Sequence, residues 1–475
     1  MSSKNNALTA GLGYTVGNIL IRCISILTLP IFSRLMTTEE FGVFNVFMSY
    51  DAVLYVIVGF ALHSSIRSAN LEFKGRIDEY TSSVSLIYLI CAVILSALVL
   101  AFGDSIGSLL GFNNVLLYLL IIHSFSSALL NLYNTKISLN YSYKKYLIVA
   151  LINSVGNVGL SLLLILTVFR NQKDVGRIVG STAVLAGLAV AILIIFFKSA
   201  KPKFNKEYWK FGLKYSLPIV PHGISQVLLG QFDRVMISKM VSDSAAGIYS
   251  LAGNLKIIMT VITNSISAAW NTWFYEMMDK GDKAAIRKRA VQLGAFFTIL
   301  SVGLMAISPE MVFILGGKEY DLAKYVAIPM ILDALVLFFY DLVVSGEYYS
   351  KKTINIMLAT MGAAVLNVVL NYIFIAKYGF IAAAYTTLAA YTVYLILHIV
   401  ISRKMVKFFI LPLKWMLVFA AIAAIMAAGC IVFMNNLILR WLLCAVIIIP
   451  MLLLLIKDVG GVKALFGSIL KKESE

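Results

Sequence analysis

Long apolar segments alternate with short polar ones along almost the whole chain. A helix that crosses the hydrocarbon core of a bilayer needs about 20 mostly apolar residues, and about fourteen segments reach that length. They lie at roughly 10–33, 41–62, 82–103, 115–135, 146–169, 177–197, 211–238, 245–273, 290–308, 322–345, 353–376, 378–402, 412–434 and 437–456. The pattern predicts an all-α polytopic membrane protein with about 14 transmembrane helices.

The composition agrees with this prediction. Of the 475 residues, 60% are hydrophobic and only 13% are charged, and the mean hydropathy is +0.90. A soluble domain carries about 25% charged residues, so most of this surface is expected to face lipid. The net charge of +17 then indicates cationic loops rather than nucleic-acid binding. Cys23, Cys91, Cys430 and Cys444 lie in apolar segments and are expected to be core residues.

Lys and Arg residues are distributed unevenly between the loops. When the N-terminus is placed in the cytoplasm, the inner loops hold about three times as many of them as the outer loops. This bias predicts that both termini are cytoplasmic and that the number of helices is even. The outer loops are short, so we expect no folded domain outside the membrane.

The two halves of the chain resemble each other. At a shift of 205 residues, the Ser33-Arg34-Leu35 segment aligns with Ser238-Lys239-Met240, and Gly42 aligns with Gly247. Six helices separate equivalent points, which predicts a parallel repeat with substrate at the interface of its halves. The expected organisation is a six-helix lobe at 1–200, a second at 201–405, and two additional helices with a cytoplasmic tail at 406–475.

Several charged residues fall inside the predicted helices, where they are costly and usually face a partner or a water-filled cavity. They are Arg22, Asp51, Asp233, Arg234, Lys256, Asp333 and Asp341. The shift of 205 places Asp51 opposite Lys256. One interpretation is a charged lumen between the halves, and the other is a structural salt bridge that holds the halves together. For Asp233 and Arg234, near the outer end of their helix, an interfacial pair is an equal alternative.

Polar side chains also form stripes on three of the predicted helices. The members are Asn18, Arg22 and Ser25 on the first helix, His222, Ser225, Gln226 and Asp233 on the seventh, and Lys256, Thr260, Thr263, Asn264 and Ser267 on the eighth. Stripes of this kind line a substrate cavity or hydrogen-bond neighbouring helices.

Two prolines, Pro218 and Pro221, lie inside the seventh predicted helix and are expected to bend it. The bend is either a moving gate or a feature without a function of its own. With Asp233, Arg234 and Asp333 they are candidates for gating or ion coupling. The histidines have no metal-ligand spacing and no catalytic motif occurs, so we expect no metal, no cofactor and no enzyme activity.

Several short segments occur in a specific order along the chain: SRLMTTEEFGVF at 33–44, YSLP at 215–218, the Asp233-Arg234 pair, AGIYS at 246–250 and KYGFIAAA at 377–384. Their order resembles that of Wzx-type polysaccharide flippases, in the superfamily that also contains multidrug exporters and lipid II flippases.

The resemblance implies translocation of undecaprenyl-pyrophosphate-linked oligosaccharide units, of the O-antigen or capsule type, across the bacterial cytoplasmic membrane by alternating access. It also implies coupling to H⁺ or Na⁺ and contact with a polysaccharide polymerase. Arg22, Lys256 and Arg234 could then offset the charge of the pyrophosphate. Two alternatives stay open: a cation-coupled multidrug exporter of the same fold, and a membrane glycan polymerase or ligase, which the short outer loops disfavour.

Overall fold

The fold is taken from a computed structural model, in which residues 13, 17, 21–22, 24–351 and 353–459 are described. These residues form helices and connecting turns, and no β-strand occurs among them. Twelve of the described helices are long and apolar enough to cross a membrane, and a shorter apolar helix spans Ile24–Leu35. The prediction of an all-α polytopic membrane protein is confirmed, while the count of 14 helices stays a prediction.

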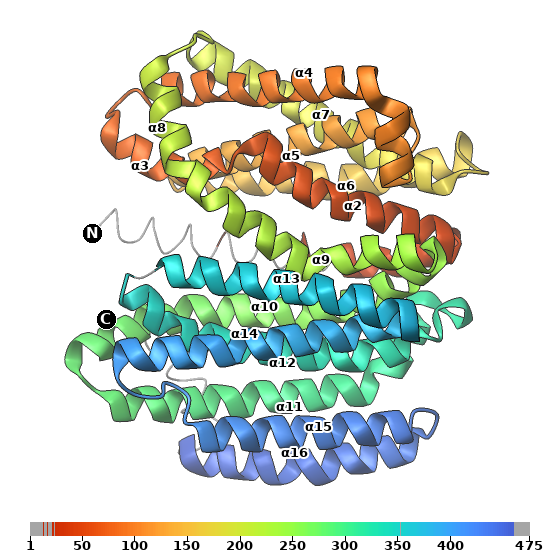
Figure 1. Ribbon diagram of the computed structural model, residues 1–475, viewed down its shortest axis with the longest axis vertical. Helices are drawn as coiled ribbons and strands as arrows, with labels where there is room; N and C mark the ends of the chain where they lie inside the picture. The colour runs from red at the N-terminus through yellow and green to blue at the C-terminus, as the bar shows by residue number, and fades with distance from the viewer. Residues whose placement is uncertain (1–12, 14–16, 18–20, 23, 352, 460–475) are drawn as a thin grey trace. The chain divides into compact units, whose positions relative to one another are not determined.

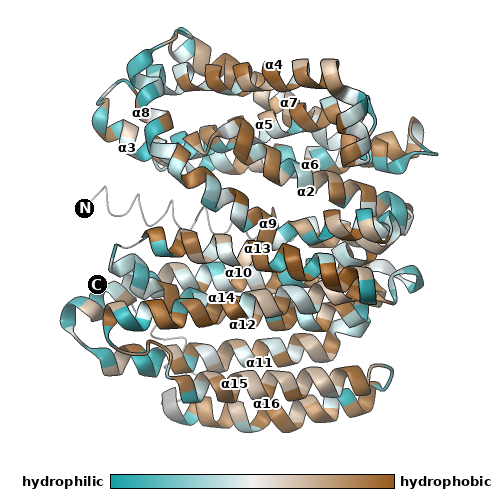
Figure 2. Ribbon diagram, in the orientation of Figure 1, coloured by the Kyte–Doolittle hydropathy of each residue, from teal (hydrophilic) through white to brown (hydrophobic). Residues whose placement is uncertain are grey.

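Packing divides the chain into two compact units, Met1–Gly247 and Ile248–Glu475. This division falls later than the predicted repeat boundary at residue 200, because the helices after that point pack on elements of the first unit. The predicted lobe boundaries concern the sequence repeat and stay predictions. Figure 2 shows hydrophobic residues along the long helices and hydrophilic residues mainly at their ends.

In the first unit, α5 (Asn114–Ser138) packs against α2 (Thr38–Gly59), α4 (Ile77–Leu110) and α7 (Lys173–Ser199), as Figure 1 shows. The remaining elements of this unit are η1 (Leu62–Ser65), α3 (Ile66–Glu72), α6 (Tyr143–Thr167), α8 (Lys206–Ser216), η2 (Leu217–Ile219) and α9 (Val220–Met240).

Side-chain caps fix several helix starts. The Thr37 hydroxyl accepts from the Glu40 amide of α2, and the Glu40 carboxylate accepts from the Thr37 amide, which satisfies two donors that a helix start leaves open. Asn113 caps α5 through the Leu116 amide in the same way. These caps therefore fix where α2 and α5 begin.

The seventh predicted helix, at 211–238, is not continuous. It consists of the short amphipathic α8, the 3₁₀ segment η2 and the helix α9. Pro218 lies in η2 and Pro221 in the first turn of α9, and neither can donate a backbone hydrogen bond to the preceding turn. The predicted helix is therefore interrupted by a 3₁₀ segment at these prolines, while a bend that acts as a gate stays a prediction.

In the second unit, α12 (Ala323–Tyr349) packs against α11 (Lys283–Gly316), α13 (Thr353–Tyr378), α14 (Ile381–Val406) and α15 (Leu413–Val432). Helix α16 (Leu437–Val459) packs on α11 and α15, and α10 (Asp243–Lys280) begins in the first unit and continues into the second. A buried arginine attaches α16 to α11. The Arg440 guanidinium pairs with Glu310 and donates to the Ala306 carbonyl at 3.2 Å.

The first turns of α2 and α10 are in close contact, and these are turns that the sequence repeat aligns. A Cβ atom on Gly42 would lie 1.8 Å from the Asp243 carbonyl oxygen, and one on Gly247 would lie 2.0 Å from the Thr38 carbonyl oxygen. The hydroxyls of Thr38 and Ser244 are hydrogen-bonded at 2.7 Å beside them. Glycine is required at both positions because backbone atoms occupy the space of a side chain.

We expect Gly42→Ala to force α2 and α10 apart and to lower the unfolding temperature of the purified protein in detergent. Overpacking of this kind costs about 1–3 kcal/mol. The matched control is Gly159→Ala on α6, where no atom lies within 4 Å of the added Cβ, and where alanine should leave stability unchanged or raise it slightly. Equal unfolding temperatures for the two variants would contradict the close contact.

Candidate functional site

Asp51 is a buried carboxylate in the first unit with two partners on α5. The Ser124 hydroxyl donates to Asp51 Oδ1 at 2.6 Å, and His123 Nδ1 lies 3.0 Å from the same oxygen. The Asp51 side chain is 9% exposed and that of His123 is 5% exposed. These contacts join α2 to α5 within one unit, and both the lumen role of Asp51 and the bridge between the halves stay predictions.

Lys256 of α10 forms the corresponding charged contact in the second unit. Its Nζ atom lies 2.6 Å from Asp333 Oδ1 on α12 and 4.8 Å from the centroid of the Tyr391 ring on α14. The Asp333 side chain is 2% exposed, whereas that of Lys256 is 20% exposed. The ammonium is thus held by a buried carboxylate and an aromatic face, while part of the Lys256 side chain stays accessible.

A hydrogen-bonded group lies further along the same two helices. The Ser267 hydroxyl of α10 donates to Asp341 Oδ2 of α12 at 3.1 Å. One turn later the Ser345 hydroxyl donates to Asn271 Oδ1 at 2.7 Å and accepts from Trp270 Nε1 at 3.0 Å. Part of the predicted polar stripe on α10 therefore hydrogen-bonds the neighbouring helix α12, which is one of the two roles that the sequence allowed for such a stripe.

The other members of that stripe do not share this environment. Thr260 and Asn264 are exposed, and the Thr260 hydroxyl donates to the Lys256 carbonyl of its own helix at 3.1 Å. Their proposed contact with a sugar stays a prediction.

The stripe on the first predicted helix is only partly described. Arg22 and Ser25 are both exposed, and the Ser25 hydroxyl donates to the Ile21 carbonyl at 3.1 Å. Arg22 lies within electrostatic range of the Tyr146 phenol on α6. Asn18 lies outside the described residues.

The stripe on α9 is mixed in burial. Asp233 is buried, His222 and Arg234 are half-buried, and Gln226 is exposed. The buried Ser225 hydroxyl donates to the Pro221 carbonyl at 2.8 Å, directly after the 3₁₀ segment. A serine hydroxyl that donates to a carbonyl of its own helix has its hydrogen-bonding capacity met there, and such a bond often bends the helix slightly.

Sequence reasoning missed the partners of the charged residues. It placed Glu347 outside the helix that it predicted at 322–345, but α12 continues to Tyr349, and Glu347 lies against His398 of α14. It also gave no role to His123 and Tyr391. Ionisable or aromatic residues inside apolar segments were the available signal, but only the packing of helices shows which of them meet.

No group of three or more histidine, cysteine, aspartate or glutamate side chains that could hold a metal ion occurs in the described part of the chain. Cys91, Cys430 and Cys444 are free thiols.

Residues 8–278 match a protein family described as "Polysaccharide biosynthesis protein". A similar protein from Haloferax volcanii is named "Probable low-salt glycan biosynthesis flippase Agl15". It is 22% identical over 396 residues, which cover 81% of this chain and 80% of the relative.

Two solved structures share the fold. A structure titled "Lipid II flippase MurJ, inward closed conformation" matches with a TM-score of 0.69 and 15% identity, over 94% of this chain and 99% of that one. An inward-facing multidrug resistance MATE family transporter matches with a TM-score of 0.61 and 13% identity, over 83% of this chain and 98% of that one.

We expect Lys256→Met to destabilise the protein, because it leaves Asp333 buried without its cation. Removing one partner of a buried pair costs about 3–5 kcal/mol. The double variant Lys256→Met with Asp333→Asn should recover most of the loss in unfolding temperature. Lys280→Met, which breaks an exposed ion pair with Glu276, is the control and should change little. Additive losses in the double variant would show that the two side chains do not interact.

Proposed function

We propose, from the premise that the chain belongs to the family of polysaccharide biosynthesis proteins, that this multi-pass membrane protein is a flippase for lipid-linked glycans. The relative from Haloferax volcanii named as a glycan biosynthesis flippase supports this function. The shared fold with the lipid II flippase structure supports a transport protein rather than an enzyme.

The observation that carries the proposal is the partly accessible Lys256 side chain, whose ammonium is paired with Asp333. An ammonium group has three donors and no acceptor. Asp333 pairs with the ammonium at 2.6 Å and the Tyr391 ring covers another side, and the side chain is 20% exposed, so it can also meet an anionic ligand. A lipid-linked sugar brings phosphate charge into a low-dielectric region, where a cation must offset it.

We propose undecaprenyl-pyrophosphate-linked oligosaccharide as the substrate, carried from the inner to the outer leaflet of the bacterial cytoplasmic membrane by alternating access. Both termini would be cytoplasmic, and a polysaccharide polymerase would take the product. Arg22 and Arg234 are further candidates for the pyrophosphate. Asn18, Ser25, His222, Gln226, Thr260 and Asn264 are candidates for the sugar, and the break at Pro218 and Pro221 is a candidate gate.

The test is reconstitution of the purified full-length protein into vesicles that contain a fluorescent undecaprenyl-pyrophosphate-linked oligosaccharide. We expect the glycan to become accessible to a membrane-impermeant quencher faster than in protein-free vesicles. Lys256→Gln should slow this step, whereas Lys280→Gln should not, because Lys280 lies in an exposed ion pair.

Two results would overturn the proposal. Exchange of cationic drugs for protons or sodium, with no movement of the lipid-linked glycan, would favour the multidrug exporter. Lengthening of glycan chains by the purified protein would favour the polymerase. Equal glycan movement by wild-type protein and Lys256→Gln at equal protein levels would remove Lys256 from the substrate path but leave the flippase function standing.

A further inference from the structure

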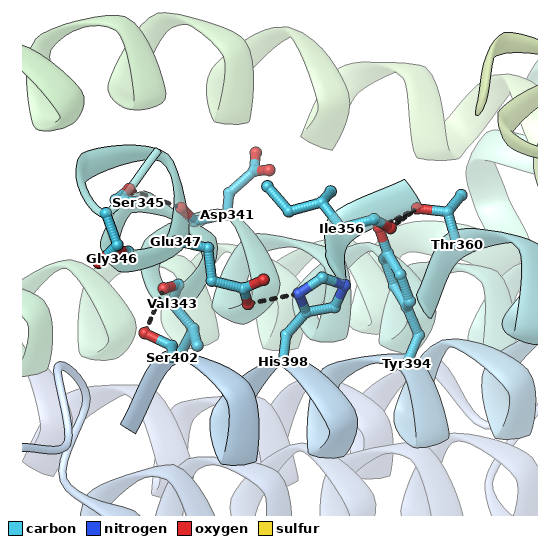
Figure 3. A network of polar contacts seen from close by, with 11 residues as sticks. Asp341, Val343, Ser345, Gly346, Glu347, Ile356, Thr360, Tyr394, His398 and Ser402 are labelled. Carbon is cyan, nitrogen blue, oxygen red and sulfur yellow. Dashed lines mark hydrogen bonds and ion pairs between the residues drawn. The ribbon is translucent and has the colours of Figure 1, made fainter. Parts of the chain in front are cut away.

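A groove opens on the surface of the second unit where α11, α15 and α16 meet. Its volume is about 490 Å³, within the range of about 300–1,000 Å³ that is usual for ligand pockets. The polar network between α12 and α14 is closed by comparison, since the side chains of Glu347 and His398 are 0% exposed (Figure 3). In the groove, Trp415 and Leu454 are 42% and 66% exposed. A ligand can therefore reach the groove without separating packed helices.

The walls of the groove are mainly apolar. Phe419 of α15 and Leu455 of α16 line it and are only 2% and 8% exposed. A Cβ atom on Gly294 of α11 would lie 2.9 Å from the Phe419 ring, so α11 and α15 are closely packed at this level. An apolar chain in the groove would thus make dispersion contacts with three helices at once.

Two cationic side chains lie at one end of the groove. They are Arg287 and Lys288 of α11, and both are exposed. Arg287 Nε donates to the Phe409 carbonyl at 3.4 Å, and its guanidinium lies 5.5 Å from the centroid of the Phe408 ring. A guanidinium carries five donors, so Arg287 can bind a phosphate while it keeps this contact. The described residues that line the groove include no acidic side chain, so this end favours an anion.

The cationic end lies where a phospholipid head group would lie. Arg287 is near the start of α11 and Trp415 is near the start of α15, and the charge bias predicts that both helices begin at the cytoplasmic side. Tryptophan is enriched at membrane–water interfaces. From Pro412 to Ile422 the α15 wall extends about 15 Å, which is about half of the hydrocarbon core. The groove therefore spans one leaflet.

We propose that this groove binds an anionic glycerophospholipid of the cytoplasmic leaflet, with its phosphate at Arg287 and Lys288 and one acyl chain along α11, α15 and α16. Basic pockets between transmembrane helices at the cytoplasmic side are suited to anionic head groups. The depth of one leaflet fits an acyl chain, whereas the much longer undecaprenyl chain would extend beyond the groove. This site does not depend on the proposed flippase function.

The bound phospholipid would complete the attachment of α16 to the rest of the second unit. At the start of α16, the Arg440 guanidinium pairs with Glu310 of α11. The groove lies at the other end of α16, where Met451, Leu454 and Leu455 face it. The ion pair therefore holds one end of α16 on α11, and the lipid holds the other end.

The first experiment uses Trp415 as a reporter, because it lines the groove. The purified full-length protein is reconstituted in phosphatidylcholine vesicles with increasing amounts of a brominated phospholipid, which quenches tryptophan fluorescence at short range. The Trp415 signal is the difference between wild-type protein and Trp415→Phe. We expect brominated phosphatidylglycerol to quench this signal at a roughly tenfold lower mole fraction than brominated phosphatidylcholine, because two cations favour the anionic head group.

The double variant Arg287→Gln with Lys288→Gln should lose this preference. The control Lys280→Gln removes a cation from an exposed ion pair outside the groove and should keep it. Equal quenching of wild-type Trp415 by the two lipids would overturn the anionic site. Displacement of brominated phosphatidylglycerol by an equimolar amount of undecaprenyl phosphate would assign the groove to the glycan carrier and overturn the phospholipid.

The second experiment separates the groove from surface charge. Phosphatidylglycerol added to the protein in detergent should raise the unfolding temperature of wild-type protein but not of Val418→Trp, which fills the groove and keeps both cations. The control is Val432→Trp on the same helix, at a residue that is 73% exposed and outside the groove, and it should respond like wild-type protein. An equal rise for the two tryptophan variants would overturn binding in the groove.

Discussion

Charged side chains inside membrane helices are costly and usually pair on a neighbouring helix, and three such contacts connect helices within the two units. Asp51 with His123 joins α2 to α5, Lys256 with Asp333 joins α10 to α12, and Glu347 with His398 joins α12 to α14. Lipid tails are as apolar as leucine side chains, so apolar burial alone does not select which transmembrane helices become neighbours. The buried pairs add that selectivity, because a helix placed elsewhere would leave a charge uncompensated.

The first two of these pairs occupy corresponding places in the predicted repeat. There α2 corresponds to α10 and α5 to α12, so each pair links the second helix of a half to the fourth. The acidic member lies on the second helix in one half and on the fourth helix in the other. The sequence alone placed Asp51 opposite Lys256 and suggested one shared lumen or one bridge. The acidic and basic members exchange helices between the two separate pairs. This exchange explains why Asp51 aligns with Lys256 without requiring a direct contact between them.

Hydropathy predicted most helices to within a few residues, because the apolar length of a membrane span is imposed by the bilayer. The prolines at 218 and 221 indicated an interruption before α9, but the 3₁₀ segment Leu217–Ile219, which contains Pro218, depends on backbone geometry that no pattern specifies. The pairing of Glu347 with His398 could not be predicted, since 51 residues separate them and nothing local shows that α12 and α14 are neighbours. For the candidate residues, the sequence shows which side chains are charged but not which residues pair with them.

Helix α12 carries two ion pairs with buried carboxylates, one that connects it to α10 and one that connects it to α14. In the pair with Asp333 the Lys256 side chain stays 20% exposed and can also meet an anionic ligand, whereas both side chains of the pair with His398 are 0% exposed. A ligand shifts a conformational equilibrium only as far as it interacts differently with the two states. Binding of an anion at Lys256 changes the charge balance near Asp333, and the pair with His398 holds the same helix against α14. Because both pairs lie on α12, a displacement of this helix on ligand binding must either keep or break its contact with α14.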